Sequence, residues 1–346
     1  MLRSPIAEKE TRVQENRLAI KGRSLWYVAP GRAEFRDERV PPPKMGELQV
    51  VALFGAISRG TERLVHAGRV PASEYERMRA PHMGGAFPFP VKYGYATVGR
   101  IEQGPAELRG RTVFTLHPHQ DVFNIAVEAV LPLPETVPPQ RAALAANMET
   151  ALNAFWDGKP AACDRIAVVG GGLVGLLCAY LCAQLPGVEV TVIDIVRSRS
   201  ELAGIIGARF ASSADDLADC DVVFHASGTA SGLATALRVA GDEATIVELS
   251  WYGSGEIAIP LGEAFHSRRL QLRSSQVGKV APSHRARWSP ARRLSAALAL
   301  LRDPVLDALI APPLAFGELP ATLESVFTGE LGSVCPLIRY PAAERP

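Results

Sequence analysis

The sequence has little net charge and no long hydrophobic run. Among its 346 residues, 37 Lys and Arg nearly balance 36 Asp and Glu, for a net charge of +1. Such a balance argues against a general attraction to nucleic acid or to a membrane surface. The longest apolar stretch, residues 173–185, is too short to span a bilayer, and residues 1–20 lack the apolar core of a signal peptide. We therefore expect a soluble cytoplasmic protein with no nucleic-acid or membrane partner.

Cysteine is scarce and follows no recognisable pattern. The five cysteines are odd in number and contain no C-x-x-C pair. This arrangement predicts neither a disulfide framework nor a zinc knuckle, and it is typical of a reducing compartment. A chain of this length with 47% hydrophobic residues is long enough for two domains, each with its own core.

The first half of the chain is rich in short strand-like segments separated by Gly and Pro. They include residues 24–28, 47–54, 95–102 and 111–116. Helical patterns are rare until residue 142. We expect a polar extension over residues 1–23 and a β-rich domain over 24–147, built as a partly open barrel.

The second half alternates strand-like and helical segments. Two buried strands, Arg165–Val169 and Glu189–Ile193, flank the apolar helical run, and three more strand-like segments follow with helices between them. This alternation predicts a doubly wound parallel sheet over residues 148–290, hence an α/β fold. Residues 291–346 are expected to form a helix and a return segment packing on the first domain.

Three glycines after the first of these strands fit the dinucleotide fingerprint G-x-G-x-x-G. Gly170 permits a tight turn, Gly172 lets the backbone approach a diphosphate, and Gly175 allows close packing of helix on strand. The helix would begin at Leu173 and Val174, so that its free amides and positive dipole end face the phosphates.

The second strand ends in Asp194, where the fingerprint places the acid that binds the ribose. An acid there favours NAD over NADP, although Arg197 or Arg199 could contact a 2′-phosphate. Ligands lie beyond the carboxyl ends of the strands in such sheets. We therefore expect further cofactor contacts from the segments after the later strands, at Ala226, Ser227, Leu249, Ser250 and Gln276.

The order of a β-rich domain, a mid-chain Rossmann unit and a short return segment resembles the medium-chain dehydrogenase/reductase superfamily of zinc-type alcohol dehydrogenases. The likeness covers residues 24–340 and implies a GroES-like catalytic domain, NAD(P) and a homodimer. Residues 58–64 and Gly94-Tyr95 look most like hydroxyethyl bacteriochlorophyllide dehydrogenase-like members. The narrower likeness rests on these two short motifs.

The family's zinc-binding positions correspond by this resemblance to Ser58, Tyr95 and Glu149. Only the carboxylate is a good zinc ligand, and the family's lobe of four cysteines is missing. We therefore expect no zinc. An atypical metal site formed by His66, Glu62 and Glu149 stays open as an alternative.

Without a metal, hydride transfer needs a hydrogen-bond donor or acid at the substrate oxygen. Tyr95 is the first candidate, with Ser58 or Thr61 as a proton relay and Glu149 as a base or a support for Tyr95. Packing beside Tyr93, or a helix-terminal acid at 149, would explain the same residues structurally. His117 and His119 are either substrate contacts or surface loop histidines.

Between Glu263 and Asp303 the chain has no acidic residue but nine Arg and Lys. This segment favours an anionic substrate, or it forms a solvated or interfacial face.

Together with the resemblance, these patterns predict a zinc-independent NAD(P)-dependent oxidoreductase whose small-molecule substrate is a secondary alcohol or its ketone. The alternatives are an enone reductase of the quinone-oxidoreductase type and a dinucleotide-binding protein without turnover.

Overall fold

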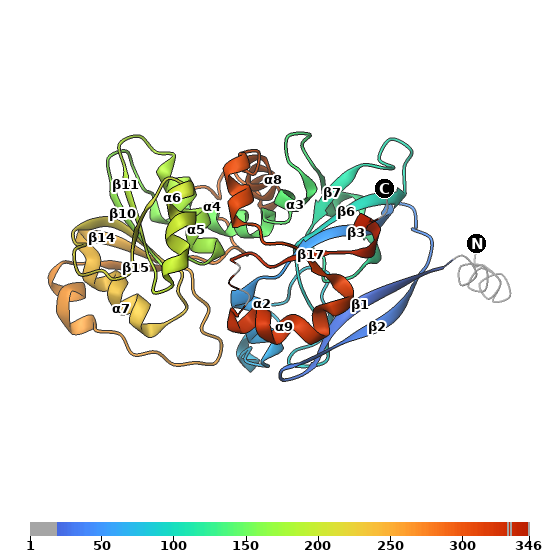
Figure 1. Cartoon of the computed structure of the whole chain (residues 1–346), viewed down its shortest axis with the longest axis horizontal. Coiled ribbons are helices and arrows are strands. Elements are labelled where there is room, and N and C mark those ends of the chain that lie inside the picture. The colour runs from blue at the N-terminus through green and yellow to red at the C-terminus, as the bar shows by residue number, and fades with distance from the viewer. Residues whose placement is uncertain (1–18, 331, 333, 345–346) are drawn as a thin grey trace. The chain divides into compact units, whose positions relative to one another are not determined.

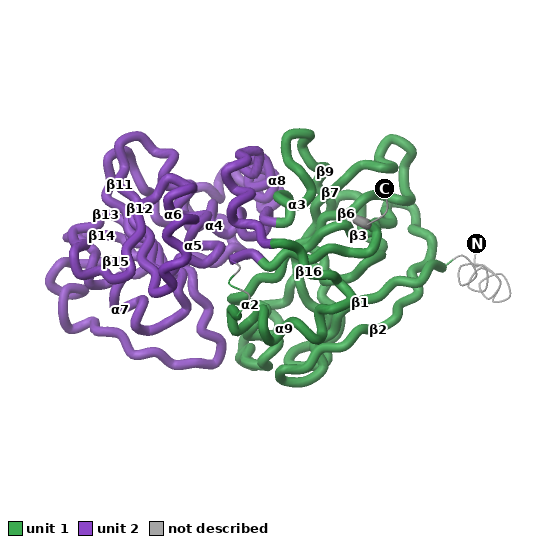
Figure 2. Tube along the Cα trace, viewed as in Figure 1, with its two compact units in different colours: residues 1–143, 312–332, 336–346 green, residues 144–311, 333–335 purple. Residues whose placement is uncertain are grey.

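The computed structural model describes residues 19–330, 332 and 334–344, which form two compact units. Unit 1 takes in the described residues of 1–143, 312–332 and 336–346, and unit 2 those of 144–311 and 333–335 (Figure 2). Most of the predicted N-terminal extension, residues 1–18, lies outside the described part. Residues 20–23, assigned to that extension, instead open the first strand.

Unit 1 is built from two mostly antiparallel sheets (Figure 1). One has the order β2-β1-β5-β4, from Arg32–Val40, Ile20–Ala29, Val91–Lys92 and Gly84–Gly85. The other has the order β16-β17-β3-β6-β7-β9, from Leu314–Ala315, Leu337–Arg339, Glu47–Ala56, Thr97–Gln103, Thr112–Thr115 and Val130–Pro132, with β8, Val122–Ala126, also pairing to β3. The parallel pair β16 and β17 brings the C-terminal segment back into unit 1.

Strand β3 is the centre of unit 1 because its sequence is apolar almost throughout. Leu48, Val50 and Ala52 are fully buried, and β3 pairs with β6, β8 and β17. Among the described residues of the unit, three α-helices accompany the sheets: α2 (Arg59–His66), α3 (Pro139–Ala142) and α9 (Leu319–Thr328). Helix α2 follows β3 after only two residues, so the strand fixes where the helix begins.

Unit 2 contains a six-stranded parallel sheet of order β12-β11-β10-β13-β14-β15 (Figure 1). The strands in that order are Arg209–Ala211, Glu189–Ile193, Arg165–Val169, Cys220–His225, Ala240–Glu248 and Gln271–Ser274. Five helices accompany them: α4 (Ala145–Gly158), α5 (Leu173–Ala183), α6 (Ser200–Ile205), α7 (Ala230–Val239) and α8 (Pro290–Leu300). The predicted fold class, a β-rich domain with a doubly wound parallel sheet, is confirmed.

Helix α8 differs from the expectation for the last segment of the chain. It packs against α4 and belongs to unit 2, so only the part from residue 312 onward, apart from a short piece near residue 334, joins unit 1. The cause is local, because Ala297 and Leu298 of α8 are buried and Arg293 is anchored within unit 2.

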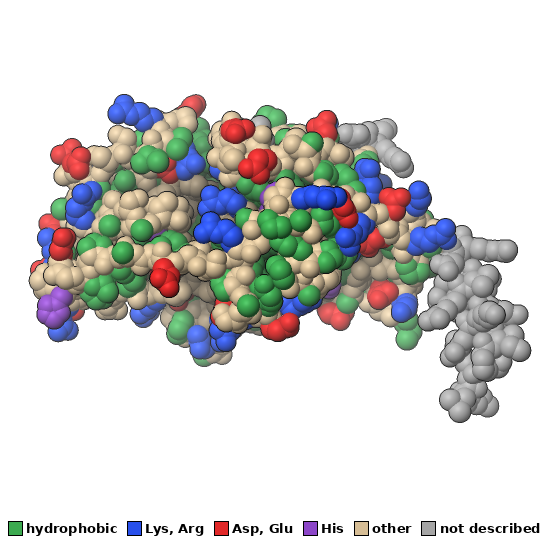
Figure 3. All heavy atoms as spheres, turned by 90° about the horizontal axis from the view of Figure 1, so that it is seen from below, with side chains coloured by type: hydrophobic (Ala, Val, Ile, Leu, Met, Phe, Trp, Pro, Cys, Tyr) green, Lys and Arg blue, Asp and Glu red, His purple; other side chains and the backbone are tan. Residues whose placement is uncertain are grey.

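The described helices include none that is long and apolar enough to cross a membrane. On the face drawn in Figure 3, acidic and basic side chains are interspersed, in keeping with the balanced composition.

We predict that Gly175→Ala destabilises unit 2. A Cβ at this position would lie 1.9 Å from the carbonyl oxygen of Gly170, so α5 would have to move off β10. Overpacking of this kind costs about 1–3 kcal/mol of unfolding free energy. The matched control is Gly204→Ala in α6, where the added Cβ meets nothing within 4 Å. Chemical denaturation followed by circular dichroism compares the two, and equal stability of both variants would contradict the packing argument.

Candidate functional site

The turn between β10 and α5 has the three glycine environments that the fingerprint requires. Gly170 has a φ of +105°, and a Cβ there would lie 2.6 Å from the Ser227 amide nitrogen. Around Gly172 nothing lies within 4 Å of a built Cβ, so its backbone is open to a ligand. Helix α5 begins at Leu173, and the amides of Leu173 and Val174 in its first turn have no intrahelical acceptor. This surface fits a diphosphate group.

Asp194 is bound tightly to that turn. Its Oδ2 accepts a hydrogen bond of 2.6 Å from the Gly171 amide, and its Oδ1 accepts one of 2.8 Å from the Val196 amide. The guanidinium of Arg199 lies 2.5 Å from Oδ2. The carboxylate is thus fixed at the end of β11, beside the glycine-rich turn, and Arg199 is already paired with it. A ribose acceptor at this position fits a dinucleotide.

A second acid at the carboxyl edge of the sheet was missed from the sequence. Glu248 ends β14 and lies directly across from His225 of β13 in the parallel register. The Nδ1 of His225 is 2.7 Å from Glu248 Oε2, and its Nε2 is 2.7 Å from Ser227 Oγ. Burial raises the pKa of Glu248, but its interactions with His225 and its hydrogen bonds with Ser250 outweigh burial and leave the pKa below its ordinary value. The register of two neighbouring strands was the only signal that could have revealed this pair.

The other expected cofactor segments lie at this same edge. Ala226 donates its amide to Val169, and Leu249 donates its amide to His225. The Ser250 amide donates to Glu248 Oε1 at 2.6 Å, while Ser250 Oγ accepts from the Gly228 amide at 3.1 Å. Gln276, after β15, accepts from the Gly278 amide. Segments after five adjacent strands, β11, β10, β13, β14 and β15, therefore contribute polar groups to one edge.

In unit 1, Tyr95 is brought together with the two hydroxyl residues proposed as its relay. Its hydroxyl is hydrogen-bonded to Ser58 and Thr61, at the N-terminal end of α2. Burial and the nearby Glu62 raise the pKa of Tyr95 to about 12, although the bonds to Ser58 and Thr61 oppose the shift. Tyr95 is therefore a neutral phenol at physiological pH, able to donate a hydrogen bond.

Glu62 holds this cluster in place. It is fully buried, and its Oε2 accepts from the Tyr27 hydroxyl at 2.9 Å and lies 2.8 Å from His119 Nε2. Its Oε1 accepts a 2.8 Å hydrogen bond from the Ser58 amide, at the N-cap of α2. From the sequence, Glu62 was expected only as a ligand of the alternative metal site. Its partners come from three separate segments, which no local motif reveals.

His117 and His119 are both buried, so the interpretation as surface loop histidines is wrong. His117 stacks on Phe123 at 3.6 Å between ring centroids, and burial holds its pKa well below the usual value. The ring of His119 packs against Gly94, where a Cβ would lie 2.8 Å from it. Its Nδ1 has no hydrogen-bond partner among the residues that the structure describes.

Glu149 makes its contacts within unit 2. The guanidinium of Arg293 donates to its Oε1 at 3.0 Å, and both side chains are buried. Burial raises the pKa of Glu149, and the charge of Arg293 opposes that shift. Arg293 belongs to the arginine-rich segment noted in the sequence, but no sequence pattern predicted its pairing with Glu149.

The donors at the positions that the resemblance assigns to zinc ligands do not fit zinc. Ser58 and Tyr95 offer neutral hydroxyls that are bonded to each other, and Glu149 is paired with Arg293. For the alternative site, Glu62 is used by Tyr27 and His119, and the His66 ring packs on Tyr27 and Phe327. Within the described ranges, no group of three or more His, Cys, Asp or Glu could hold a metal ion.

A protein-family model described as an NAD(P)-binding Rossmann-like domain matches residues 168–199, which contain the glycine-rich turn and Asp194. Among solved structures, the chain is similar to a dehydrogenase from Sinorhizobium meliloti bound to NADP, at 18% identity and a TM-score of 0.73, covering 92% of this chain and 99% of that one.

Two further solved structures have comparable likeness. 2R,3R-butanediol dehydrogenase from Bacillus subtilis is 16% identical, with a TM-score of 0.71 and coverage of 92% and 99%. Galactitol-1-phosphate dehydrogenase from Escherichia coli is 17% identical, with a TM-score of 0.70 and coverage of 92% and 100%. The chain therefore has the fold of these dehydrogenases over nearly its whole length, with an NAD(P)-binding Rossmann-like segment at its centre.

Proposed function

We propose that the chain is a zinc-independent NAD(P)-dependent oxidoreductase that transfers a hydride between the nicotinamide and a secondary alcohol or its ketone. The observation that carries the proposal is the neutral phenol of Tyr95, held by Ser58 and Thr61 where zinc-type enzymes have metal ligands. The likeness in fold to alcohol and polyol dehydrogenases supports it. That part of the support is an analogy between folds, which does not by itself fix function.

In this proposal unit 2 binds the dinucleotide. The backbone at Gly172, Leu173 and Val174 would hold the diphosphate, and Asp194 the ribose of the adenosine half. The loops at Ala226–Ser227, Leu249–Ser250 and Gln276 would contact the nicotinamide half. The bound cofactor supplies or accepts the hydride. Because Asp194 is already paired with Arg199, we propose a preference for NAD, with NADP as the alternative.

Tyr95 would handle the proton in unit 1. In reduction, its hydroxyl donates a hydrogen bond to the carbonyl oxygen and gives up its proton as the oxygen gains charge. Ser58 or Thr61 then relays a proton from solvent to the phenolate, taking up one proton as it gives up another. In oxidation the same transfers run in reverse. Glu62 would act as a positioning residue, because it fixes the N-terminus of α2 that carries both hydroxyls. Glu149 would not transfer a proton itself and would act only by holding Arg293 in place.

The same phenol could polarise an enone, so reduction of an activated C=C bond is the second candidate reaction. Activity on enones but not on alcohols would select it. Tight dinucleotide binding with no turnover on either class would instead favour the non-catalytic alternative.

We also propose a cytoplasmic homodimer. The five cysteines are unpaired, and four of them are buried, which suits a reducing compartment. Strand β15 ends the parallel sheet, and its residues are largely exposed, so its edge is available for pairing with a second copy.

We predict that Tyr95→Phe lowers kcat about 10²–10⁴-fold, the usual contribution of a general acid or base. Affinity for NADH, measured by fluorescence titration, should be unchanged. In the reduction direction, the wild type should lose no activity through Tyr95 up to about pH 10, because a pKa of about 12 keeps the phenol protonated. The control is Tyr75→Phe, whose ring packs on Phe87. Equal kcat in the two variants would rule out the role of Tyr95.

We predict that Asp194→Ala weakens NADH binding at least about tenfold, which corresponds to the loss of one charged hydrogen bond. Affinity for NADPH should fall less, because the repulsion of a 2′-phosphate is removed. Asp215→Ala, a substitution of an exposed acid, is the control. Fluorescence titrations with both nucleotides measure the ratio. If both affinities stay at wild-type values in Asp194→Ala, the dinucleotide does not bind at the end of β11.

A further inference from the structure

The arginine-rich segment between residues 263 and 303 separates into two groups by the contacts of its side chains. Four arginines have partners that account for them: Arg268 and Arg269 with acidic side chains, Arg292 with the ring of Trp288, and Arg293 with Glu149. Part of the segment therefore consists of arginines that are already paired within the protein, as its composition allowed. Other cations of the segment, Arg273, Lys279 and Arg285, lie together around a pocket.

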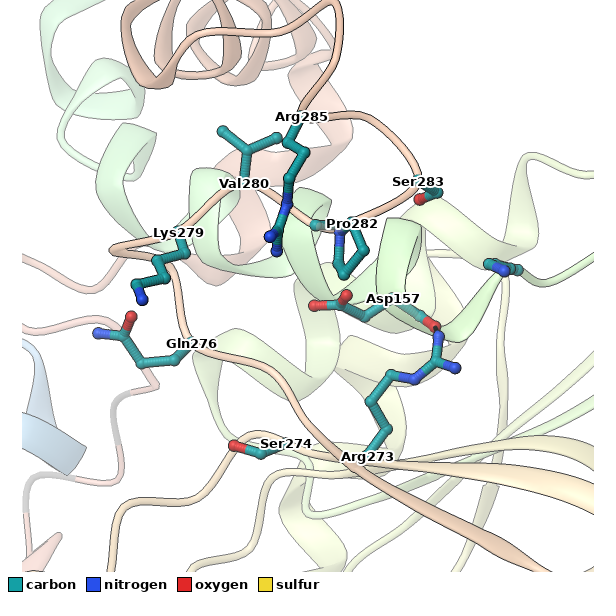
Figure 4. A pocket seen from close by; sticks show the side chains of 11 residues that line it. Asp157, Arg273, Ser274, Gln276, Lys279, Val280, Pro282, Ser283 and Arg285 are labelled. Atoms are coloured by element: carbon teal, nitrogen blue, oxygen red, sulfur yellow. Dashed lines mark hydrogen bonds between the residues drawn. The ribbon is translucent and has the colours of Figure 1, made fainter.

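This pocket has a volume of about 410 Å³ and lies entirely within unit 2. Its lining includes four cationic side chains, Lys159, Arg273, Lys279 and Arg285, but only one acid, Asp157. In Figure 4 the Arg285 side chain is directed from the loop after β15 toward the Asp157 carboxylate, whereas the Lys279 side chain is directed toward Gln276, and all four residues line the pocket. The cations thus outnumber the acid within one concave site.

Among the described residues, Asp157 forms no ion pair with these cations. Its Oδ2 accepts hydrogen bonds from Ser275 at 2.8 Å and from Asn153 at 3.2 Å, and its carbonyl accepts from Arg273 at 2.7 Å. Lys279 and Arg285 form no side-chain hydrogen bond or ion pair with the residues that the structure describes. Their charges are free to meet an anion from solution.

The loop that carries Lys279 is held by hydrogen bonds to Arg293 and Asn153. Arg293, which is 2% exposed, donates to the carbonyls of Val277 and Lys279, and Asn153 accepts from the Ala281 amide at 3.0 Å. These bonds fix the backbone on both sides of Lys279 before any ligand arrives. A prearranged loop loses little conformational freedom on binding, which favours affinity.

We propose that this pocket binds the anionic group, a phosphate or a carboxylate, of a small molecule. Guanidinium and ammonium groups supply the charge-assisted hydrogen bonds that such groups accept. The volume of about 410 Å³ leaves room beyond a single phosphate, so a small organic molecule that carries the anionic group fits. This site stands apart from the hydride-transfer proposal, because it needs neither the dinucleotide nor Tyr95.

The test is calorimetric titration of the full-length protein at low ionic strength with inorganic phosphate and, separately, with malonate. Each titration is run with and without saturating NADH. We expect one anion per chain, and the tighter of the two identifies phosphate or carboxylate as the group recognised. Lys279→Gln and Arg285→Gln should each weaken binding about tenfold, whereas Arg292→Gln, the matched control, should bind normally. Asp157→Asn should tighten binding because it removes the one acid.

Three results would overturn the proposal. The first is that neither anion binds. The second is that Lys279→Gln and Arg285→Gln bind the anion as tightly as Arg292→Gln does. The third is that NADH displaces the anion, which would place the anion at the glycine-rich turn. The titration without NADH does not depend on turnover. Its result can therefore be interpreted even if the protein lacks the proposed oxidoreductase activity.

Discussion

The buried carboxylate of Glu62 is the constraint on which the proposed catalytic chemistry of unit 1 depends. A charge out of contact with water is stable only if other groups compensate it. Here Tyr27, His119 and the Ser58 amide do so, and through them Glu62 ties β1, α2 and the loop before β8 together. The hydroxyls of Ser58 and Thr61 are thereby fixed against Tyr95, whose pKa the same carboxylate helps to raise. Glu62 thus positions the hydroxyls around the phenol and adds to the burial that keeps the phenol protonated.

Unit 2 repeats this use of acids at the edge of its sheet. Asp194 fastens the end of β11 to the glycine-rich turn, and Glu248 links β14 to β13 through His225. Glu149 fixes Arg293, which in turn holds the loop around Lys279. Each carboxylate joins segments that are adjacent in space but distant in the chain, so the edge is rigid before a ligand binds. Rigid, prearranged polar groups are what recognition of a charged dinucleotide requires.

Much of unit 2 could be predicted from the sequence, because its signals are local. Strands β10 and β11 match their predicted bounds, since continuous β-branched runs end abruptly at Gly170 and Asp194. Strand β2 was not predicted, because its sequence, Arg32–Val40, is highly charged and its side chains are mostly not buried. The pairs Glu62–His119 and Glu149–Arg293 lie 57 and 144 residues apart, and no local pattern reports such contacts. Local patterns could therefore suggest candidate residues but not the partners that determine what those residues can do.

Metal content measured together with dinucleotide binding tests the central claim most directly. Purified protein would be analysed by mass spectrometry for zinc, while NADH is titrated into the same sample and its fluorescence followed, before and after treatment with a chelator. The account predicts no stoichiometric zinc and tight NADH binding that the chelator leaves unchanged. One firmly held zinc per chain, with dehydrogenase activity that the chelator removes, would contradict this account. The substrate oxygen would then be polarised by the metal rather than by Tyr95.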